Sequence, residues 1–417
     1  MVWTFGAYLL AALALAVLAA IALWAHLYYW VKRLTLPLEY CAEEVLETGD
    51  GARIELRRVP RPPTATEQPD LPPILLVHGL AANHRNQDIH PDYSLARHLA
   101  ALGRDVWLLT LRSGRLLTRV ERRSVRFSAM AQHDLPCAVD AVLKRTGARS
   151  LDYVGFSMGG MLLYAALGRS VASEQIRRVV IVGSPGRLVA PTRLLPYVPG
   201  RLLPGVPLRL IRHVPGRLLP GVPLRLMARS VAFASEWVPT PLHHAVANPR
   251  NVPPGVTRLA LVNCIEDIPA ALNADFATWL ASDGEIRVNG ERVLDGLASV
   301  AAPALFIAGS ADRIAPVSSV RAAFDAWGRD HPESPKRFVV LGRDFGARED
   351  YGHGDLAVGA YTGAELFEPI ARFLGPDQQE QPADVAGPET GAPALEAIQA
   401  RQPTSSEVDP LPDLPPA

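Results

Sequence analysis

The segment with the clearest chemical meaning is residues 151–160, Leu-Asp-Tyr-Val-Gly-Phe-Ser-Met-Gly-Gly. It places Ser157 between Gly155 and Gly159, after a short apolar run and before an apolar helical pattern. A serine at such a strand-to-helix turn is held in a strained backbone, and the small glycines let strand and helix approach without a clash. The helix N-terminus offers N–H groups to a developing negative charge. The pattern predicts Ser157 as the nucleophile of acyl transfer, whereas an isolated G-x-S-x-G would be an ordinary glycine-rich turn.

Two downstream side chains could activate that serine. Asp312 stands in a turn after a predicted strand, where a carboxylate can orient a histidine and stabilise its protonated form, although loop aspartates are often plain turn residues. His353 lies in a glycine-flanked loop after the next predicted strand, whereas His331 precedes that strand and belongs to its other end. The chain order Ser157, Asp312, His353 predicts a catalytic triad. Asp355 is interpreted as a capping residue of the histidine loop.

A second source of N–H groups follows the apolar run that ends at Val77, in His78-Gly79-Leu80. Such a turn after a buried strand can supply half of an oxyanion hole. We expect the backbone N–H groups of Leu80 and Met158 to form that hole together. Taken alone, His78-Gly79 would fit an ordinary strand-ending turn equally well.

Composition excludes several other classes of protein. Lysine plus arginine and aspartate plus glutamate number 42 each, so a net charge of zero gives no reason to expect a nucleic-acid partner. Cys41, Cys137 and Cys264 form neither a zinc spacing nor a disulfide framework, and we expect them to be small buried residues. His243 and His244 have no carboxylate or cysteine nearby to complete a metal site and are interpreted as surface residues. No metal or organic cofactor is implied.

The elements that position these residues alternate between short apolar runs and helical patterns. Strand and helix in alternation predict an α/β fold, a mostly parallel doubly wound sheet with helices on both faces. The strands are expected at 53–59, 74–77, 105–110, 151–154, 179–182, 304–308 and 337–341. The helices are expected at 92–102, 128–145, 160–167 and 364–374.

The N-terminal segment contains no charged residue from Phe5 to Val31. Roughly 27 residues at ~1.5 Å each reach about 40 Å, more than a ~30 Å hydrocarbon core. Aromatic residues lie at both ends of the run, and Lys32 and Arg33 follow it. A cleaved signal peptide would need a basic stretch before the run and small residues after it, and neither is present. We expect residues 1–35 to be a single-pass transmembrane anchor, with the catalytic domain on the cytoplasmic side because basic residues follow the run.

The stretch from about Gly186 to Val300 interrupts the alternation and is expected to form a cap over the substrate site. Its sequence does not single out substrate-binding residues. Residues 198–210 recur unchanged as 214–226, which is interpreted as a local duplication because two copies cannot form a solenoid. From Arg187 to Ser235 there are eight arginines and no acidic residue. Such a basic, apolar cap could rest on anionic lipid, or could simply be a solvated surface.

Residues 375–417 are rich in proline, alanine and acids and show no sustained apolar period. Such a segment cannot bury enough apolar surface to offset the entropy lost on ordering. We expect a disordered tail there, after a catalytic domain at 36–374.

Several segments resemble the acid lipases, a family of α/β-hydrolase fold enzymes. They are residues 94–108, 130–140, 153–159 and 351–355, so the resemblance covers most of 72–184 and 303–374 but not the cap. The chain is similar more distantly to polyhydroxyalkanoate synthases, through Asp-Arg-Ile-Ala-Pro at 312–316. Those enzymes use a cysteine nucleophile where this chain has Ser157. Acid lipases also lack a retained anchor, so the resemblance does not fix the substrate.

These observations together predict a serine hydrolase that cleaves a lipophilic carboxylic ester through an acyl-enzyme. Transfer of the acyl group to an alcohol or thiol is an alternative, because its first half-reaction is identical. A non-catalytic membrane scaffold on a hydrolase core is the alternative from a different class. The intact set Ser157, Asp312 and His353 argues against the scaffold.

Overall fold

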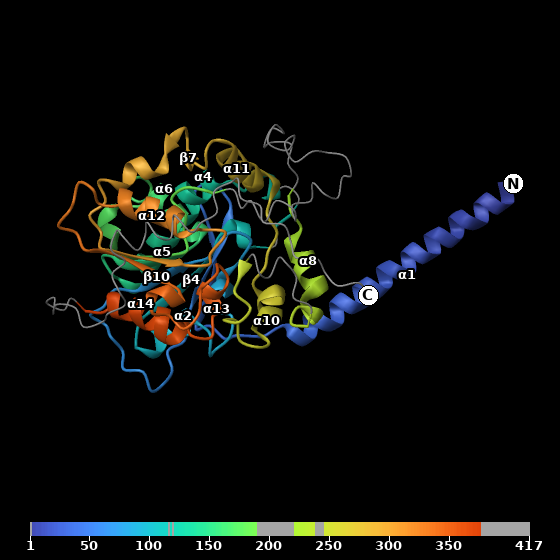
Figure 1. Ribbon diagram of the computed structural model, residues 1–417, viewed down its shortest axis with the longest axis horizontal. Helices are drawn as coiled ribbons and strands as arrows, with labels where there is room; N and C mark the ends of the chain where they lie inside the picture. The colour runs from blue at the N-terminus through green and yellow to red at the C-terminus, as the bar shows by residue number, and fades with distance from the viewer. Residues whose placement is uncertain (1, 116, 119–120, 190–220, 238–245, 377–417) are drawn as a thin grey trace.

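The computed structural model describes residues 2–115, 117–118, 121–189, 221–237 and 246–376, built around an eight-stranded sheet (Figure 1). The strand order is β1-β2-β4-β3-β5-β6-β9-β10, parallel from β4 to β10, with β1 and β2 antiparallel at one edge. The strands are β1 (Ala42–Glu47), β2 (Arg53–Arg58), β3 (Ile74–Val77), β4 (Val106–Thr110), β5 (Leu151–Phe156), β6 (Ile176–Val182), β9 (Ala304–Gly309) and β10 (Lys336–Leu341). The predicted parallel sheet is confirmed.

The central strands are continuous apolar runs because both of their faces are covered. Along β3, Leu75 and Val77 pack into the core on one side of the sheet, while Ile74 and Leu76 pack into the core on the other. All four side chains are fully buried. Successive side chains of a strand point to opposite faces, so a strand enclosed by two helical layers must be apolar at every position.

Helices cover both faces, as the alternation predicts (Figure 1). On one face lie α5 (Leu135–Thr146), α6 (Met158–Ala166) and α12 (Val317–Ala326). On the other lie α2 (Leu95–Ala101), α13 (Asp355–Val358) and α14 (Glu368–Phe373). Shorter helical pieces are α3 (Glu121–Ser124) and α4 (Phe127–Ala129), with π-helical turns at Met130–Asp134 and Gly363–Phe367.

The chain between β6 and β9, residues 183–303, is a long insertion at the place where the cap is expected. Its described parts contain α8 (Leu224–Val231), α10 (Val256–Asn263), α11 (Ala270–Ala281) and the small hairpin of β7 (Arg287–Val288) and β8 (Glu291–Arg292). The first copy of the duplication, most of the second copy and the pair His243–His244 lie outside the described residues, as does almost all of the predicted tail. The last residues of the second copy form the start of α8.

The two expected ends of the cap, Gly186 and Val300, both pack against the body of the domain. The Gly186 N–H donates to the carbonyl oxygen of Ser319 in α12 at 2.8 Å, and a Cβ on Gly186 would lie 2.6 Å from the backbone nitrogen of Ala323. Val300 is 2% exposed and packs into the core on the α12 side of the sheet. Any cap over the site must therefore lie inside these two residues, because both ends are already packed on α12 and the sheet.

The N-terminal helix α1 (Val2–Leu34) projects from the body (Figure 1). Within it, Leu10–Leu34 spans 25 residues with a mean hydropathy of 2.3 and no buried part. It is long and apolar enough to cross a membrane, a property that signal sequences near an N-terminus share. The last turns of α1 contact α8 and α10.

Three further details differ from the predictions. Strand β1 is not predicted, because half of its sequence, Ala-Glu-Glu-Val-Leu-Glu, is charged. The helix expected at 128–145 is divided into α4, a π-helical turn and α5, with Pro136 in the first turn of α5, where its missing N–H has no intrahelical acceptor to lose. Of the three cysteines, only Cys264 is buried, whereas Cys137 is half-buried and Cys41 is exposed.

Candidate active site

The structure brings Ser157, Asp312 and His353 together at one edge of the sheet. Ser157 directly follows β5, Asp312 lies in the turn after β9, and His353 lies in the loop after β10. The carboxyl ends of parallel strands meet at the same edge, which is where open α/β sheets bind ligands. Residues separated by up to 196 positions in the sequence are thus in hydrogen-bond contact.

The turn that carries Ser157 is strained and needs its glycines. Ser157 has φ 52° and ψ −118°, a conformation that side chains with a Cβ rarely adopt. A Cβ on Gly155 would lie 2.6 Å from the backbone nitrogen of Gly160, and one on Gly159 would lie 2.3 Å from the carbonyl oxygen of Val77. Both glycines are therefore required by the close approach of β5, β3 and α6.

The three polar side chains form a continuous hydrogen-bonded chain. His353 Nε2 lies 2.9 Å from Ser157 Oγ, and His353 Nδ1 lies 2.7 Å from Asp312 Oδ2. The other carboxylate oxygen of Asp312 accepts the backbone N–H groups of Ile314 and Ala315, both at 2.8 Å. Each of the three side chains belongs to a residue that is less than a tenth exposed. Two backbone bonds and one imidazole thus fix the Asp312 carboxylate in place.

The loop after β3 lies against the serine. A Cβ on Gly79 would be 3.1 Å from Ser157 Cβ, a tight contact that would require one of the two to shift by a few tenths of an ångström. Leu80 follows Gly79 in that loop, and Met158 begins α6. Within the described parts of the chain, neither the Leu80 nor the Met158 N–H has a hydrogen-bond acceptor. The expected oxyanion hole of Leu80 and Met158 therefore has no competing acceptor among the described residues.

His78 holds this loop in shape. Its Nε2 accepts the backbone N–H of Leu111 at 3.1 Å, so Nδ1 must carry the proton, and Nδ1 donates to the carbonyl oxygen of Gly79 at 2.8 Å. Burial lowers the pKa of His78 to about 4, which keeps the ring neutral. The side chain of Asn86 accepts the Gly79 N–H at 3.1 Å. The sequence predicts this loop after β3, but the hydrogen bonds that His78 and Asn86 make to it are visible only in the structure.

Asp355 does more than cap a loop. Its carboxylate accepts the backbone N–H of Gly352 at 2.9 Å, next to His353, and the backbone N–H of Asn248 at 3.0 Å in the insertion. It also accepts the side-chain amide of Asn251 at 2.8 Å. Burial raises the pKa of Asp355 to about 6. Asp355 therefore ties the histidine loop to the insertion, and its position two residues after His353 is the only signal of this in the sequence.

His331 is separate from this cluster. It precedes β10 and lies 3.2 Å from Glu333 at the surface. Among the residues that the structure describes, no group of three or more His, Cys, Asp or Glu side chains is arranged to hold a metal ion.

Residues 72–347 match the model of the alpha/beta hydrolase fold family. The chain belongs to that family. The matched segment contains Ser157 and Asp312 and ends before His353, so the place of His353 at the site rests on the geometry above. Membership of the alpha/beta hydrolase family agrees with the order of strands and helices and with the serine at the turn after β5.

Individual relatives are lipases and esterases. The chain is 35% identical over 129 residues to human gastric triacylglycerol lipase, covering 28% of this chain and 32% of that one. It is 30% identical over 158 residues to the bovine gastric triacylglycerol lipase, covering 36% and 40%. The chain thus spans about a third to two fifths of the length of these lipases, and the predicted resemblance to acid lipases is confirmed over that part. A solved esterase from Thermogutta terrifontis superposes with a TM-score of 0.47 at 17% identity, over 80% of this chain and 98% of the esterase.

Proposed function

We propose that the protein is a carboxylic ester hydrolase in which Ser157, His353 and Asp312 act as a catalytic triad. The observation that carries the proposal is the pair of contacts of one imidazole, 2.9 Å to Ser157 Oγ and 2.7 Å to Asp312 Oδ2. A histidine that reaches a hydroxyl with one nitrogen and a buried carboxylate with the other is suited to remove the hydroxyl proton. Family membership and the lipase relatives support the same reaction class.

In this mechanism His353 Nε2 takes the proton of Ser157 as Oγ attacks the ester carbonyl carbon. The new C–O bond moves the carbonyl electron pair to the oxygen, which the N–H groups of Leu80 and Met158 would stabilise. Collapse of this tetrahedral species breaks the bond to the alcohol, which leaves with the proton from His353. Water then attacks the acyl-enzyme with His353 again as base, releasing the acid and restoring Ser157.

We propose a lipophilic acyl or alcohol group on the substrate, bound by residues of the insertion between Gly186 and Val300. The relatives above carry triacylglycerol in their names, and the insertion has eight arginines without an acidic residue from Arg187 to Ser235. The apolar helix α1 would keep such an enzyme beside its substrate. Acyl transfer to another alcohol shares the first half-reaction and would appear as product formation that depends on an added acceptor.

We also propose that α1 is a retained anchor with the remaining domain, 36–374, on the cytoplasmic side. The exposed Lys32 and Arg33 at the body end of α1 and the aromatic residues just before them fit a membrane interface. A cleaved signal sequence is the alternative for α1. Mass spectrometry of the membrane-bound protein distinguishes the two: an intact N-terminus supports the anchor, and a mature chain that lacks α1 excludes it.

The decisive experiment is fluorophosphonate labelling of the detergent-solubilised full chain, wild type beside Ser157→Ala, with turnover of p-nitrophenyl esters of increasing chain length. We expect labelling of wild type only, and a loss of turnover of at least about a thousandfold in Ser157→Ala, as for other triad serines. Equal labelling of both proteins would refute Ser157 as nucleophile. Turnover limited to the shortest esters would refute the lipophilic substrate and leave the triad standing.

A further inference from the structure

Helix α8 turns its apolar side chains outward and its charged side chains inward, the reverse of an ordinary surface helix. A surface helix turns its apolar side inward and its charges outward. In α8 the side chains of Leu226, Met227 and Val231 are each about half exposed, at 51%, 53% and 52%. Trp237, which follows a 3-10 turn six residues beyond the end of α8, is 67% exposed. We refer to these four residues as the α8 face.

The charged residues of α8 point into the protein. Arg225 pairs with Glu266 at 3.2 Å, and its backbone N–H donates to Asp267 at 3.1 Å. Arg229 donates to the carbonyl oxygen of Val262 on α10 at 3.2 Å. Both arginines therefore bond to groups of the protein instead of facing solvent, and the exposed side of α8 is apolar. A contiguous exposed apolar patch marks an interaction surface.

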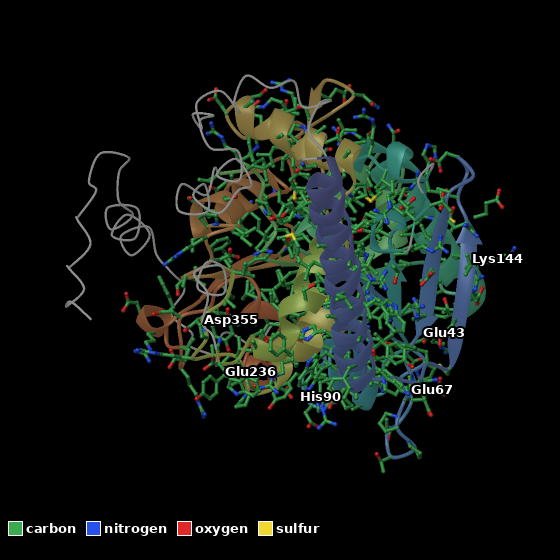
Figure 2. All side chains as sticks on the ribbon, turned by 90° about the vertical axis from the view of Figure 1, so that its right-hand side faces the viewer. Glu43, Glu67, His90, Lys144, Glu236 and Asp355 are labelled. Atoms are coloured by element: carbon green, nitrogen blue, oxygen red, sulfur yellow. The ribbon has the colours of Figure 1, made fainter. Side chains whose placement is uncertain are left out.

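Helix α8 lies beside α1 (Figure 2) and contacts it. His26 of α1 contacts the carbonyl oxygen of Ser230 at 3.3 Å, and the rings of His26 and Trp30 pack on Phe233, with centroids 4.7 and 5.7 Å away. Asn263 of α10 bonds the Leu34 carbonyl oxygen at 2.9 Å. These contacts fix α8 against the last turns of α1.

The length of α1 indicates at which level of the membrane α8 would lie. The 25 residues of Leu10–Leu34 extend about 37 Å, which exceeds a hydrocarbon core of about 30 Å, so the final turns of α1 reach the headgroup region. The exposed Tyr28 and Tyr29 fit that level, and Lys32 and Arg33 follow in the position of headgroup contacts. The contacts of α8 with α1 lie in these same final turns. A helix held there presents its outer side to the membrane boundary.

We propose that the α8 face is a membrane-contact surface that inserts into the headgroup boundary of the same bilayer that holds α1. The inference rests on α1 as a membrane anchor and does not depend on ester hydrolysis. Its occupant is lipid, because α8 packs on the last turns of α1, an apolar helix long enough to cross a membrane, whose hydrophobic window has no buried residue. A helix with one apolar side lying in the boundary plane is a common form of peripheral attachment.

Contact at the α8 face would also orient the site. The Asn83 side chain donates to the carbonyl oxygen of Asn263 at the end of α10, and the Glu266 N–H donates to the carbonyl oxygen of Ala81. Ala81 follows Leu80 in the loop that lies against Ser157. The end of α10 and the residue Glu266 after it are therefore bonded to the loop of the proposed oxyanion hole. A membrane contact at the α8 face would place this side of the molecule, with the active-site edge of the sheet, toward the lipid.

Lipid-borne quenching of a fluorescent label on the full chain in lipid nanodiscs tests this proposal. In a background with Cys41→Ser and Cys137→Ser, in which only the buried Cys264 remains, one accessible cysteine is introduced as Met227→Cys or Val231→Cys and labelled with an environment-sensitive dye. Leu102→Cys is the matched control, because Leu102 is exposed and precedes β4, at the opposite edge of the sheet from the site. Nitroxide near the top of the acyl chains and iodide in the water serve as the two quenchers.

We expect nitroxide lipid to quench the labels on α8 at least about twofold more than the Leu102→Cys label, since interfacial helices insert roughly 5–10 Å. Iodide should quench them less than the control. Equal quenching of all three labels by both agents would overturn the proposal. Protection that disappears when each disc holds one chain would identify a second copy as the occupant, and would also overturn it. The readout is independent of turnover, so a failed hydrolase assay leaves this test valid.

Discussion

The carboxylate of Asp355 and the side-chain amide of Asn251 are joined by a hydrogen bond of 2.8 Å, across 104 positions of the sequence. Asp355 is two residues from His353 and accepts the Gly352 N–H, so this bond connects the proposed catalytic base to the insertion. We infer that Asp355 is a positioning residue, which acts on the reaction through the orientation of the His353 loop.

Replacing this carboxylate tests that role. Asp355→Asn keeps the shape but sets an amide N–H₂ against N–H donors, which costs about 1–3 kcal/mol for an unpaired buried group. We expect kcat for a soluble short-chain ester to fall about tenfold or more, in line with that loss, with little change in KM. Fluorophosphonate labelling should slow in proportion, while near-ultraviolet circular dichroism stays that of the wild type.

Asp295→Asn is the control for this measurement, because Asp295 is exposed and is paired only weakly with Arg292, at 4.0 Å. Its labelling rate should equal that of the wild type. If Asp355→Asn also labels at the wild-type rate, the His353 loop holds its geometry without Asp355 and the positioning role is wrong.

Gly159 is a position beside the active site where a single methyl group should be damaging. An alanine Cβ there would lie 2.3 Å from the carbonyl oxygen of Val77, a backbone atom of a central strand that cannot move aside cheaply. We expect Gly159→Ala to lower the free energy of unfolding by about 1–3 kcal/mol, as overpacked cores do, and to reduce fluorophosphonate labelling because Ser157 shifts. Denaturant unfolding of the full chain in detergent measures the first effect.

Gly363 offers a matched substitution with the opposite expectation. No atom lies within 4 Å of a Cβ built on Gly363, and its φ is not positive. Gly363→Ala should therefore be neutral or stabilise by roughly 0.5–1 kcal/mol through the lower backbone entropy of the unfolded chain. If the two variants unfold alike, the close approach of α6 to β3 is not what requires glycine at Gly159.

The sequence predicts best those features whose cause is local. The run Ile74–Val77 must be apolar at every position to be buried on both faces, so β3 is recognisable directly. Ser157 is recognisable because the turn after β5 requires small neighbours on both sides. Strand β1 escapes prediction because it pairs only with β2 at the sheet edge, where charged side chains are tolerated and no apolar pattern is required.

The ends of the insertion are harder to predict than its existence. The apolar alternation stops near Gly186 and resumes after Val300, but where the chain leaves the body depends on its packing against α12 and the sheet. A glycine in a proline-rich stretch gives no sign that Ala323 of α12 requires it to be small. The predicted bounds therefore mark the loss of a pattern, whereas the contacts of Gly186 and Val300 are made with distant elements that the pattern does not reveal.

The supports of the site could not be predicted either. Asp355 and Asn263 act through partners more than 100 residues away, and their sequence neighbourhoods give no sign of those contacts. The reversed polarity of α8 is also a tertiary property. The sequence places the arginines of that segment in solvent or on anionic lipid, whereas Arg225 and Arg229 are turned toward the protein. The inward arginines and the outward apolar side chains of α8 follow from packing, not from periodicity alone.

His78 should give the stability of the protein a measurable pH dependence. Its folded pKa of about 4 lies below the ordinary value near 6.5, so between those values the unfolded chain binds more protons than the folded one. The contribution of His78 to the free energy of unfolding is therefore present in full above about pH 6.5 and is lost as the pH falls toward 4. Asp355, whose pKa is raised to about 6, has the opposite slope between about pH 4 and 6, so a comparison with a His78 variant is needed.

His78→Gln keeps a donor and an acceptor for Gly79 and Leu111 but does not ionise in this range. Between pH 7.5 and 4.5 we expect the wild type to lose on the order of 2 kcal/mol more unfolding free energy than His78→Gln does. Urea unfolding of the full chain in a nonionic detergent, at pH intervals across that window, measures the difference. His331→Gln, at a surface histidine remote from the site, should reproduce the wild-type slope. Parallel curves for wild type and His78→Gln would mean that the loop admits a charged imidazole, and that the neutral ring does not set the shape of the Gly79–Leu80 turn.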